Sequence, residues 1–203
     1  QDPAAAVARY GIAAPLGPYT GRLDNDAETL LLRDALGNVA DRVRYADEGS
    51  WPELADGGGS SVELVHHDLE NRWGPAWAAS AGEGTPGRQN SRFAADPPPL
   101  IAGVEHAPVV PTSGDRVRVL AAASDERPLG AVTLFYEVDG SAVPAAQVEM
   151  ADDGARDDGV AGNGIFGAEI PPQSNLAIVA FWIRAQAAGG QVAVAPAGAP
   201  SPA

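Results

Sequence analysis

Hydrophobic and polar residues alternate with a period of two along much of the chain, a pattern typical of half-buried β-strands. In residues 38–45 one face holds Val43 and Tyr45, while the other face is rich in arginine. The leucine-rich residues 29–32 precede this stretch, and residues 34–38 between the two runs are typical of a turn. The pattern therefore predicts a β-hairpin in the first half of the chain.

The second half of the chain repeats the same alternation at intervals typical of a β-sandwich. Val119 and Ala121 alternate with polar or small residues, and so do Val132 and Leu134. The predicted strands lie within residues 100–108, 115–124, 131–140, 145–153, 165–171 and 177–186. A last hairpin is predicted in residues 186–194.

Proline marks the division between the two halves. Residues 92–99 contain Pro97, Pro98 and Pro99 in succession, which favours a stiff polyproline II spacer over a flexible tether. The only helical signal is an alanine-rich stretch within residues 3–12, long enough for one or two turns. We therefore predict an all-β chain with a domain boundary at the proline-rich segment.

Composition narrows the classes of function. The formal net charge is −14 and the sequence pI is about 4.4, which disfavours nucleic acid as a partner because a phosphate backbone attracts basic surfaces. Cysteine is absent, which excludes disulfides and thiolate metal sites. No apolar run approaches 18 residues, so no membrane insertion is expected. The chain begins with Gln1 and not with methionine, which favours the interpretation that it is a processed or excised piece of a longer protein.

A set of residues in the first half falls in an order that resembles the bacterial form of the lamin tail domain. The set consists of Leu23, Asn25, Glu28, Leu30, Leu32, Gly37, Val39, Asp41, Val43, Tyr45, Trp51, Pro52, Ala55, Asp56, Gly57, Gly59, Ser61, Glu63, Leu64, Asn71, Trp77, Gly84, Thr85, Pro86, Gly87 and Asn90. The resemblance covers roughly residues 16–91, and its specificity comes from the number of positions rather than from any one of them.

The resemblance implies an immunoglobulin-like β-sandwich that serves as an extracellular accessory module. The N-terminal strands of the family have no counterpart here, so we expect the first sandwich to be incomplete, its gap filled by another segment, by a second chain or by residues 3–14. We predict four segments. Residues 1–92 form a partial lamin tail-like sandwich, residues 93–99 form a proline-rich hinge, residues 100–195 form an immunoglobulin-like sandwich and residues 196–203 form a disordered tail. The second sandwich resembles modules that follow lamin tail domains.

No catalytic constellation assembles from the sequence. The chain has no nucleophile elbow, no P-loop and no dinucleotide fingerprint. His66, His67 and Asp68 are metal-ligand types, but adjacent residues of a strand point to opposite faces, so surface histidines are the expectation. Trp51, Trp73, Trp77 and Trp182 are spread along the sequence and do not predict a sugar-binding platform.

The glycine-rich residues 151–171 gather an unusual number of carboxylates. We predict that Asp152, Asp153, Asp157, Asp158 and Asn163 lie around one calcium ion, because carboxylates that converge repel one another and calcium takes six to eight oxygen ligands. The alternative is an acidic hairpin loop with Asp-Gly turns at residues 153–154 and 158–159.

These observations predict a non-catalytic accessory, spacer or adhesion region of a secreted or surface bacterial protein, with calcium as its one candidate cofactor. Another protein segment or chain that completes the first sandwich is the expected partner. The alternative is a carbohydrate- or substrate-binding module appended to an enzyme, such as a spore-coat kinase-like protein.

Overall fold

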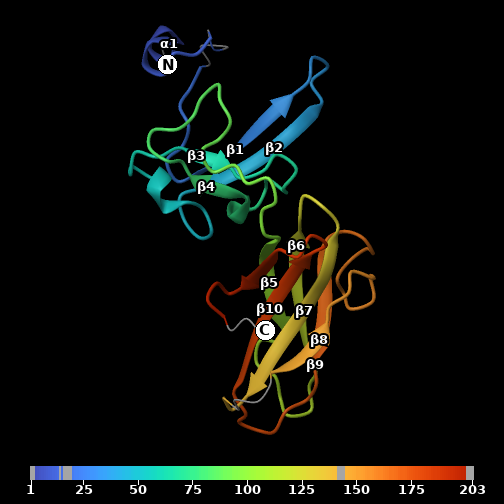
Figure 1. The fold of residues 1–203 in the computed structure, drawn as a ribbon. Coiled ribbons are helices and arrows are strands. Elements are labelled where there is room, and N and C mark those ends of the chain that lie inside the picture. The colour runs from blue at the N-terminus through green and yellow to red at the C-terminus, as the bar shows by residue number, and fades with distance from the viewer. Residues whose placement is uncertain (1–2, 14, 16–19, 141–144, 200–203) are drawn as a thin grey trace. The chain divides into compact units, whose positions relative to one another are not determined.

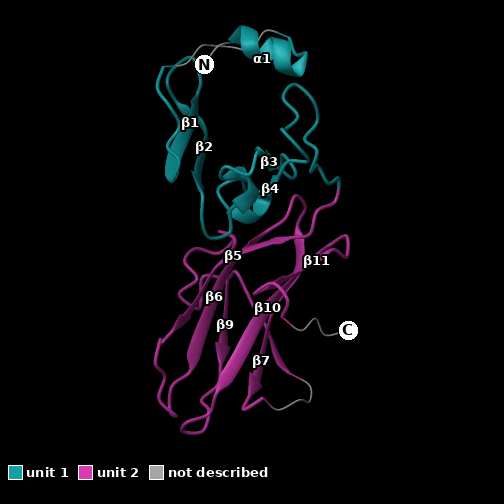
Figure 2. Cartoon of the chain, turned by 90° about the vertical axis from the view of Figure 1, so that its left-hand side faces the viewer, with its two compact units in different colours: residues 1–95 teal, residues 96–203 magenta. Residues whose placement is uncertain are grey.

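The computed structural model describes residues 3–13, 15, 20–140 and 145–199, and it is predominantly β, as the sequence predicts (Figure 1). The chain divides into two compact units, residues 1–95 and residues 96–203, which Figure 2 shows in different colours. The division falls within the proline-rich segment 93–99. Part of the predicted tail, residues 200–203, lies outside the described residues.

Unit 1 begins with the short helix α1 (Pro3–Tyr10), in the alanine-rich stretch where one or two helical turns are predicted. It continues with the predicted hairpin, in which β1 (Ala27–Arg33) and β2 (Val39–Ala46) pair antiparallel. The Asp34 carboxylate closes the turn between them by accepting the backbone N–H groups of Leu36 and Asn38. Such side-chain acceptance is the usual role of an aspartate at the first position of a turn.

No described helix has the length and apolar character needed to cross a membrane.

The rest of unit 1 is built from short elements. They are the 3-10 turn η1 (Glu53–Ala55), β3 (Val62–Leu64), the 3-10 turn η2 (Gly74–Ala76) and β4 (Trp77–Ala79). β3 and β4 pair antiparallel, so unit 1 holds two separate two-stranded sheets within its described residues. The described part of unit 1 is therefore not a closed sandwich.

The described residues of unit 2 form a seven-stranded β-sandwich. Its strands are β5 (Leu100–Ala107), β6 (Val117–Ser124), β7 (Leu129–Val138), β8 (Ala146–Glu149), β9 (Ile165–Ile170), β10 (Val179–Ala187) and β11 (Val192–Ala195). One sheet has the order β11-β10-β7-β8 and the other has the order β5-β6-β9. Every strand overlaps a segment that the alternation predicts.

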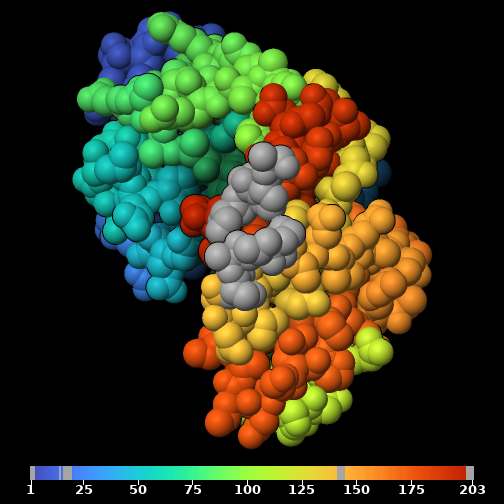
Figure 3. All heavy atoms as spheres, turned by 60° about the horizontal axis from the view of Figure 1, so that its bottom comes forward, coloured from blue at the N-terminus to red at the C-terminus, as the bar shows by residue number. Residues whose placement is uncertain are grey.

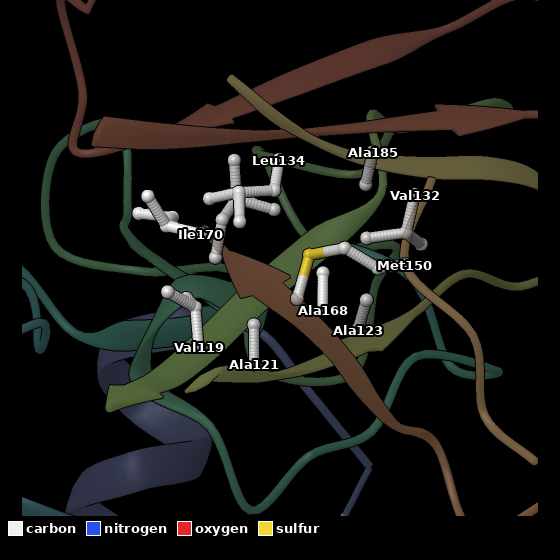
Figure 4. Close-up of a cluster of buried hydrophobic side chains, with 10 residues drawn as sticks. Val119, Ala121, Ala123, Val132, Leu134, Met150, Ala168, Ile170 and Ala185 are labelled. Atoms are coloured by element: carbon white, nitrogen blue, oxygen red, sulfur yellow. The ribbon is translucent and has the colours of Figure 1, made fainter. Parts of the chain in front are cut away.

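The core of unit 2 lies between these two sheets (Figure 4). Val119 and Ala121 of β6 face Val132 and Leu134 of β7, and all four side chains are at most 1% exposed. Each pair is two residues apart, so both members leave the same face of their strand. Met150, the only methionine of the chain, fills the space near them and is also buried. The two predicted alternations are thus confirmed as core faces.

Candidate functional site

Unit 1 contains an apolar groove of about 560 Å³, which we call the tryptophan groove. Residues from β1, β2, β3 and β4 and from the loop before η1 line it. Its apolar lining is Leu23, Leu30, Val43, Tyr45, Ala46, Trp51, Pro52, Ala55, Gly57, Val62 and Trp77, and its polar lining is Asp24, Asn25, Asp47 and Asp56. An apolar hollow with a few polar groups is the usual composition of a binding site.

Two of the tryptophans meet in this groove. The rings of Trp51 and Trp77 stack with centroids 5.9 Å apart and planes 28° apart. The Trp77 indole N–H donates to the carbonyl of Asn71 at 2.8 Å, and the Tyr45 hydroxyl donates to the carbonyl of Asp24 at 2.6 Å. The positions of the tryptophans in the sequence lead to the expectation that they are scattered in the structure. This is wrong for Trp51 and Trp77, because the fold brings together these two residues, which are 26 positions apart in the sequence. The expectation holds for Trp182, which is buried in unit 2 against Phe135.

The β1–β2 hairpin that forms one wall of the groove leaves its leucines uncovered. Leu30, Leu31 and Leu32 are between 39% and 65% exposed. β1 and β2 pair only with each other among the described strands, so each has a free edge. Such an edge, next to exposed apolar side chains, is a template for another strand. Helix α1 does not fill this space, because none of its residues lines the groove and Arg9 instead pairs with Glu83 at 2.8 Å.

A buried carboxylate joins β3 to residues 85–92 of unit 1. Glu63 of β3 is 5% exposed and accepts hydrogen bonds from the hydroxyls of Thr85 and Ser91 and from the backbone N–H groups of Ser91 and Arg92. Burial by itself would raise the pKa of Glu63, but these hydrogen bonds to the charged form outweigh burial and lower the pKa below its ordinary value. Nothing in the sequence signals this site, because the donors lie 22 to 29 residues away.

The adjacent histidines of unit 1 lie on one side of the chain, contrary to the expectation from strand geometry. β3 ends at Leu64, so His66 and His67 occupy the turn that follows and not a strand. Their rings stack with centroids 4.5 Å apart, and Phe93 stacks on His66 at 5.3 Å. His66, His67 and Asp68 are the only described group of three such residues whose ligand atoms lie within 4.8 Å of one another.

The acidic loop, residues 151–164, connects β8 to β9 at the surface of unit 2 (Figure 3). Asp158 is 1% exposed and accepts the backbone N–H groups of Asp153, Gly154 and Arg156. Asp152 accepts those of Gly162, Asn163 and Gly164 at 2.8 to 3.2 Å. The two carboxylates thus bind the loop to itself, in the manner of Asx turns.

The remaining predicted ligands of the loop point to other partners. Asp153 pairs with Arg156 at 2.9 Å, and Asp157 pairs with Arg118 of β6. The N–H of Ala155 and the arginine hold the pKa of Asp153 below its ordinary value, against a smaller effect of burial. Asn163 donates its side-chain N–H to the carbonyl of Asp158. Each predicted carboxylate ligand thus has N–H or arginine partners in this structure, and these partners offset the repulsion among the carboxylates.

A second acidic group in unit 2 has weaker partners. The carboxylate oxygens of Asp125 and Glu126, in the turn between β6 and β7, are buried without a hydrogen-bond donor within the part of the chain that the structure describes. Arg127 contacts Glu126 at 3.6 Å and Asp96 at 3.3 Å. Burial first, and then the neighbouring Glu126, raise the pKa of Asp125 to about 6. The sequence shows Asp-Glu-Arg there, which is typical of a solvated turn, and so gives no hint of this burial.

No protein-family model matches the chain, and no curated protein matches it in sequence. The resemblance to the lamin tail domain rests on the residues of the first half of the sequence alone.

Proposed function

We propose that this chain is a non-catalytic accessory region of a secreted or surface bacterial multidomain protein. In this proposal unit 2 is a spacer and unit 1 is the adhesive part, whose tryptophan groove and open hairpin accept a strand from another segment or chain. The observation that carries the proposal is the joint exposure of Leu30, Leu31 and Leu32 beside an apolar groove and a free strand edge. The extracellular location is supported by the lamin tail resemblance of the sequence.

A second candidate function is carbohydrate binding at the same groove, as part of an enzyme such as a spore-coat kinase-like protein. It is favoured by one specific observation, the union of Tyr45, Trp51 and Trp77 with Asp24 and Asn25 in one hollow. Aromatic faces bind the apolar faces of sugars, and carboxylate and amide groups bind their hydroxyls.

The first testable prediction separates these two functions. Leu30→Glu should abolish self-association of the chain in sedimentation velocity and the aggregation of beads coated with it, because the new charge enters the apolar groove. Leu36→Glu is the matched control, since Leu36 is 87% exposed in the same hairpin and does not line the groove. A wild-type chain that neither associates nor aggregates beads would contradict the adhesive role.

Affinity electrophoresis in gels that contain polysaccharide tests the carbohydrate function. If the polysaccharide retards the wild-type chain and Trp51→Ala removes this retardation, the carbohydrate function is supported instead.

The second prediction concerns calcium, which we propose as a stabiliser of unit 2. An ion bound at the acidic loop would replace the arginine partners of Asp153 and Asp157. It would bind Asp152 and Asp158 in addition to the backbone N–H groups from which they already accept hydrogen bonds. Millimolar calcium should then raise the melting temperature of unit 2, because binding only the folded state contributes about 2.7 kcal/mol at a hundredfold excess over the dissociation constant. Calorimetry with calcium and with a chelator measures this. An identical melting temperature under both conditions would mean that the loop is an acidic turn that does not bind calcium.

A further inference from the structure

We infer that the turn formed by His66, His67 and Asp68 binds a divalent transition-metal ion, with zinc as its representative. Two imidazoles and one carboxylate form a donor set that zinc favours in proteins. In this structure one ligand atom from each of the three residues already lies within 4.8 Å of the other two. This site is separate from the acidic loop, and it does not depend on the adhesive function proposed above.

His66 is the fixed member of the donor set. Its side chain is 10% exposed, and its ring stacks with the ring of His67 and with the ring of Phe93. The backbone N–H of Asp68 lies 3.2 Å from His66 Nδ1. A backbone N–H can only donate, so Nδ1 carries the lone pair and the proton is on Nε2. This lone pair accepts the Asp68 N–H in this structure, so a metal bound at Nδ1 would replace that hydrogen bond.

His67 and Asp68 are the adjustable members. Asp68 Oδ2 lies 3.5 Å from His67 Nε2 and 4.0 Å from His66 Nδ1. The ligand atoms of a tetrahedral zinc site, with bonds of about 2.0–2.1 Å, are about 3.3 Å apart, so small movements complete the site. Since imidazole lone pairs lie in the ring plane, the stacked rings must turn relative to each other. The side chain of His67 is 75% exposed and that of Asp68 is 60% exposed, which leaves room for these rotations.

The turn itself explains why three consecutive residues can share one ion. In an extended strand, neighbouring side chains leave opposite faces and could not meet. The chain leaves β3 at Leu64, and the N–H of Leu69 donates to the carbonyl of His66 at 3.2 Å, which closes a tight turn. This turn brings the two imidazoles and the carboxylate to one side. Water or a ligand from solution would occupy the remaining coordination positions.

Isothermal titration of the 203-residue chain with zinc ion alone tests the inference. The wild type should bind one equivalent, and His67→Ala and Asp68→Asn should each weaken binding by more than about tenfold. Both side chains are exposed, so the variants should melt at the wild-type temperature without zinc. His106→Ala is the control, because His106 is exposed and lies outside the cluster.

Three results would overturn the inference. One is a wild-type chain that binds no zinc. The other is a zinc affinity that His67→Ala leaves unchanged, which would assign binding to carboxylates elsewhere, including those of the acidic loop. Equal losses in His67→Ala and His106→Ala would also contradict a site at this turn.

Discussion

Glu63→Ala should lower the unfolding free energy of unit 1 by about 3 kcal/mol, because it removes a buried acceptor and leaves its donors unpaired. Four hydrogen bonds end on this one carboxylate, and they join β3 to residues 85–92. Urea unfolding monitored by tryptophan fluorescence measures the change, since Trp51, Trp73 and Trp77 all belong to unit 1.

Glu53→Ala is the matched control, because Glu53 is an exposed residue of unit 1. The pH dependence gives an independent check of the cause. Because the pKa of Glu63 is lowered in the folded state, its stabilising contribution is present above the unfolded pKa of about 4.3 and is lost as the pH falls through the folded pKa. The difference between wild type and Glu63→Ala should therefore shrink only in acid. If Glu63→Ala lowered the unfolding free energy by less than about 1 kcal/mol at neutral pH, the four hydrogen bonds to Glu63 would not stabilise unit 1 to the expected extent.

Asp125→Asn should stabilise unit 2 at neutral pH by about 1 kcal/mol, after allowance for solvent screening. The pKa of Asp125 is raised to about 6, so the folded state favours the protonated carboxyl. The corresponding stability is fully present below the ordinary pKa of about 4 and is lost as the pH rises through about 6. Asparagine keeps the shape of the protonated form and cannot ionise. The Asp125→Asn variant should therefore not show the loss of stability that the wild type shows as the pH rises.

The measurement is the melting temperature of unit 2 in wild type and variant between pH 4 and pH 8. The two curves should approach each other toward pH 4 and separate above pH 6, with the variant more stable. Asp157→Asn is the control, because Asp157 is an exposed aspartate of the same unit and pairs with Arg118. A variant that is less stable than wild type at pH 8 would mean that the Asp125 carboxylate has a stabilising partner, and the explanation by burial would fail.

The strands of unit 2 could be predicted from the sequence because their signal is local. Val119 and Ala121, like Val132 and Leu134, repeat at the period that a pleated strand imposes, and the same period places them in the core. The β1–β2 hairpin could be predicted for the same reason, together with the turn residues around Asp34. Strand β4 was missed, because Trp77–Ala79 is three residues long and shows no alternation.

The candidate sites depended on contacts that no local pattern contains. Trp51 and Trp77 meet only after the chain has folded back, and the donors to Glu63 come from a segment more than twenty residues away. The period-two rule gave the wrong geometry for His66 and His67, because β3 ends two residues before His66. Alternation along a strand is fixed by the backbone of that strand, whereas the side chains that share a site are brought together by turns and by tertiary packing. The sequence by itself therefore determined most of the strands and which residues of unit 2 face the core, and only the tertiary structure decided which polar side chains meet.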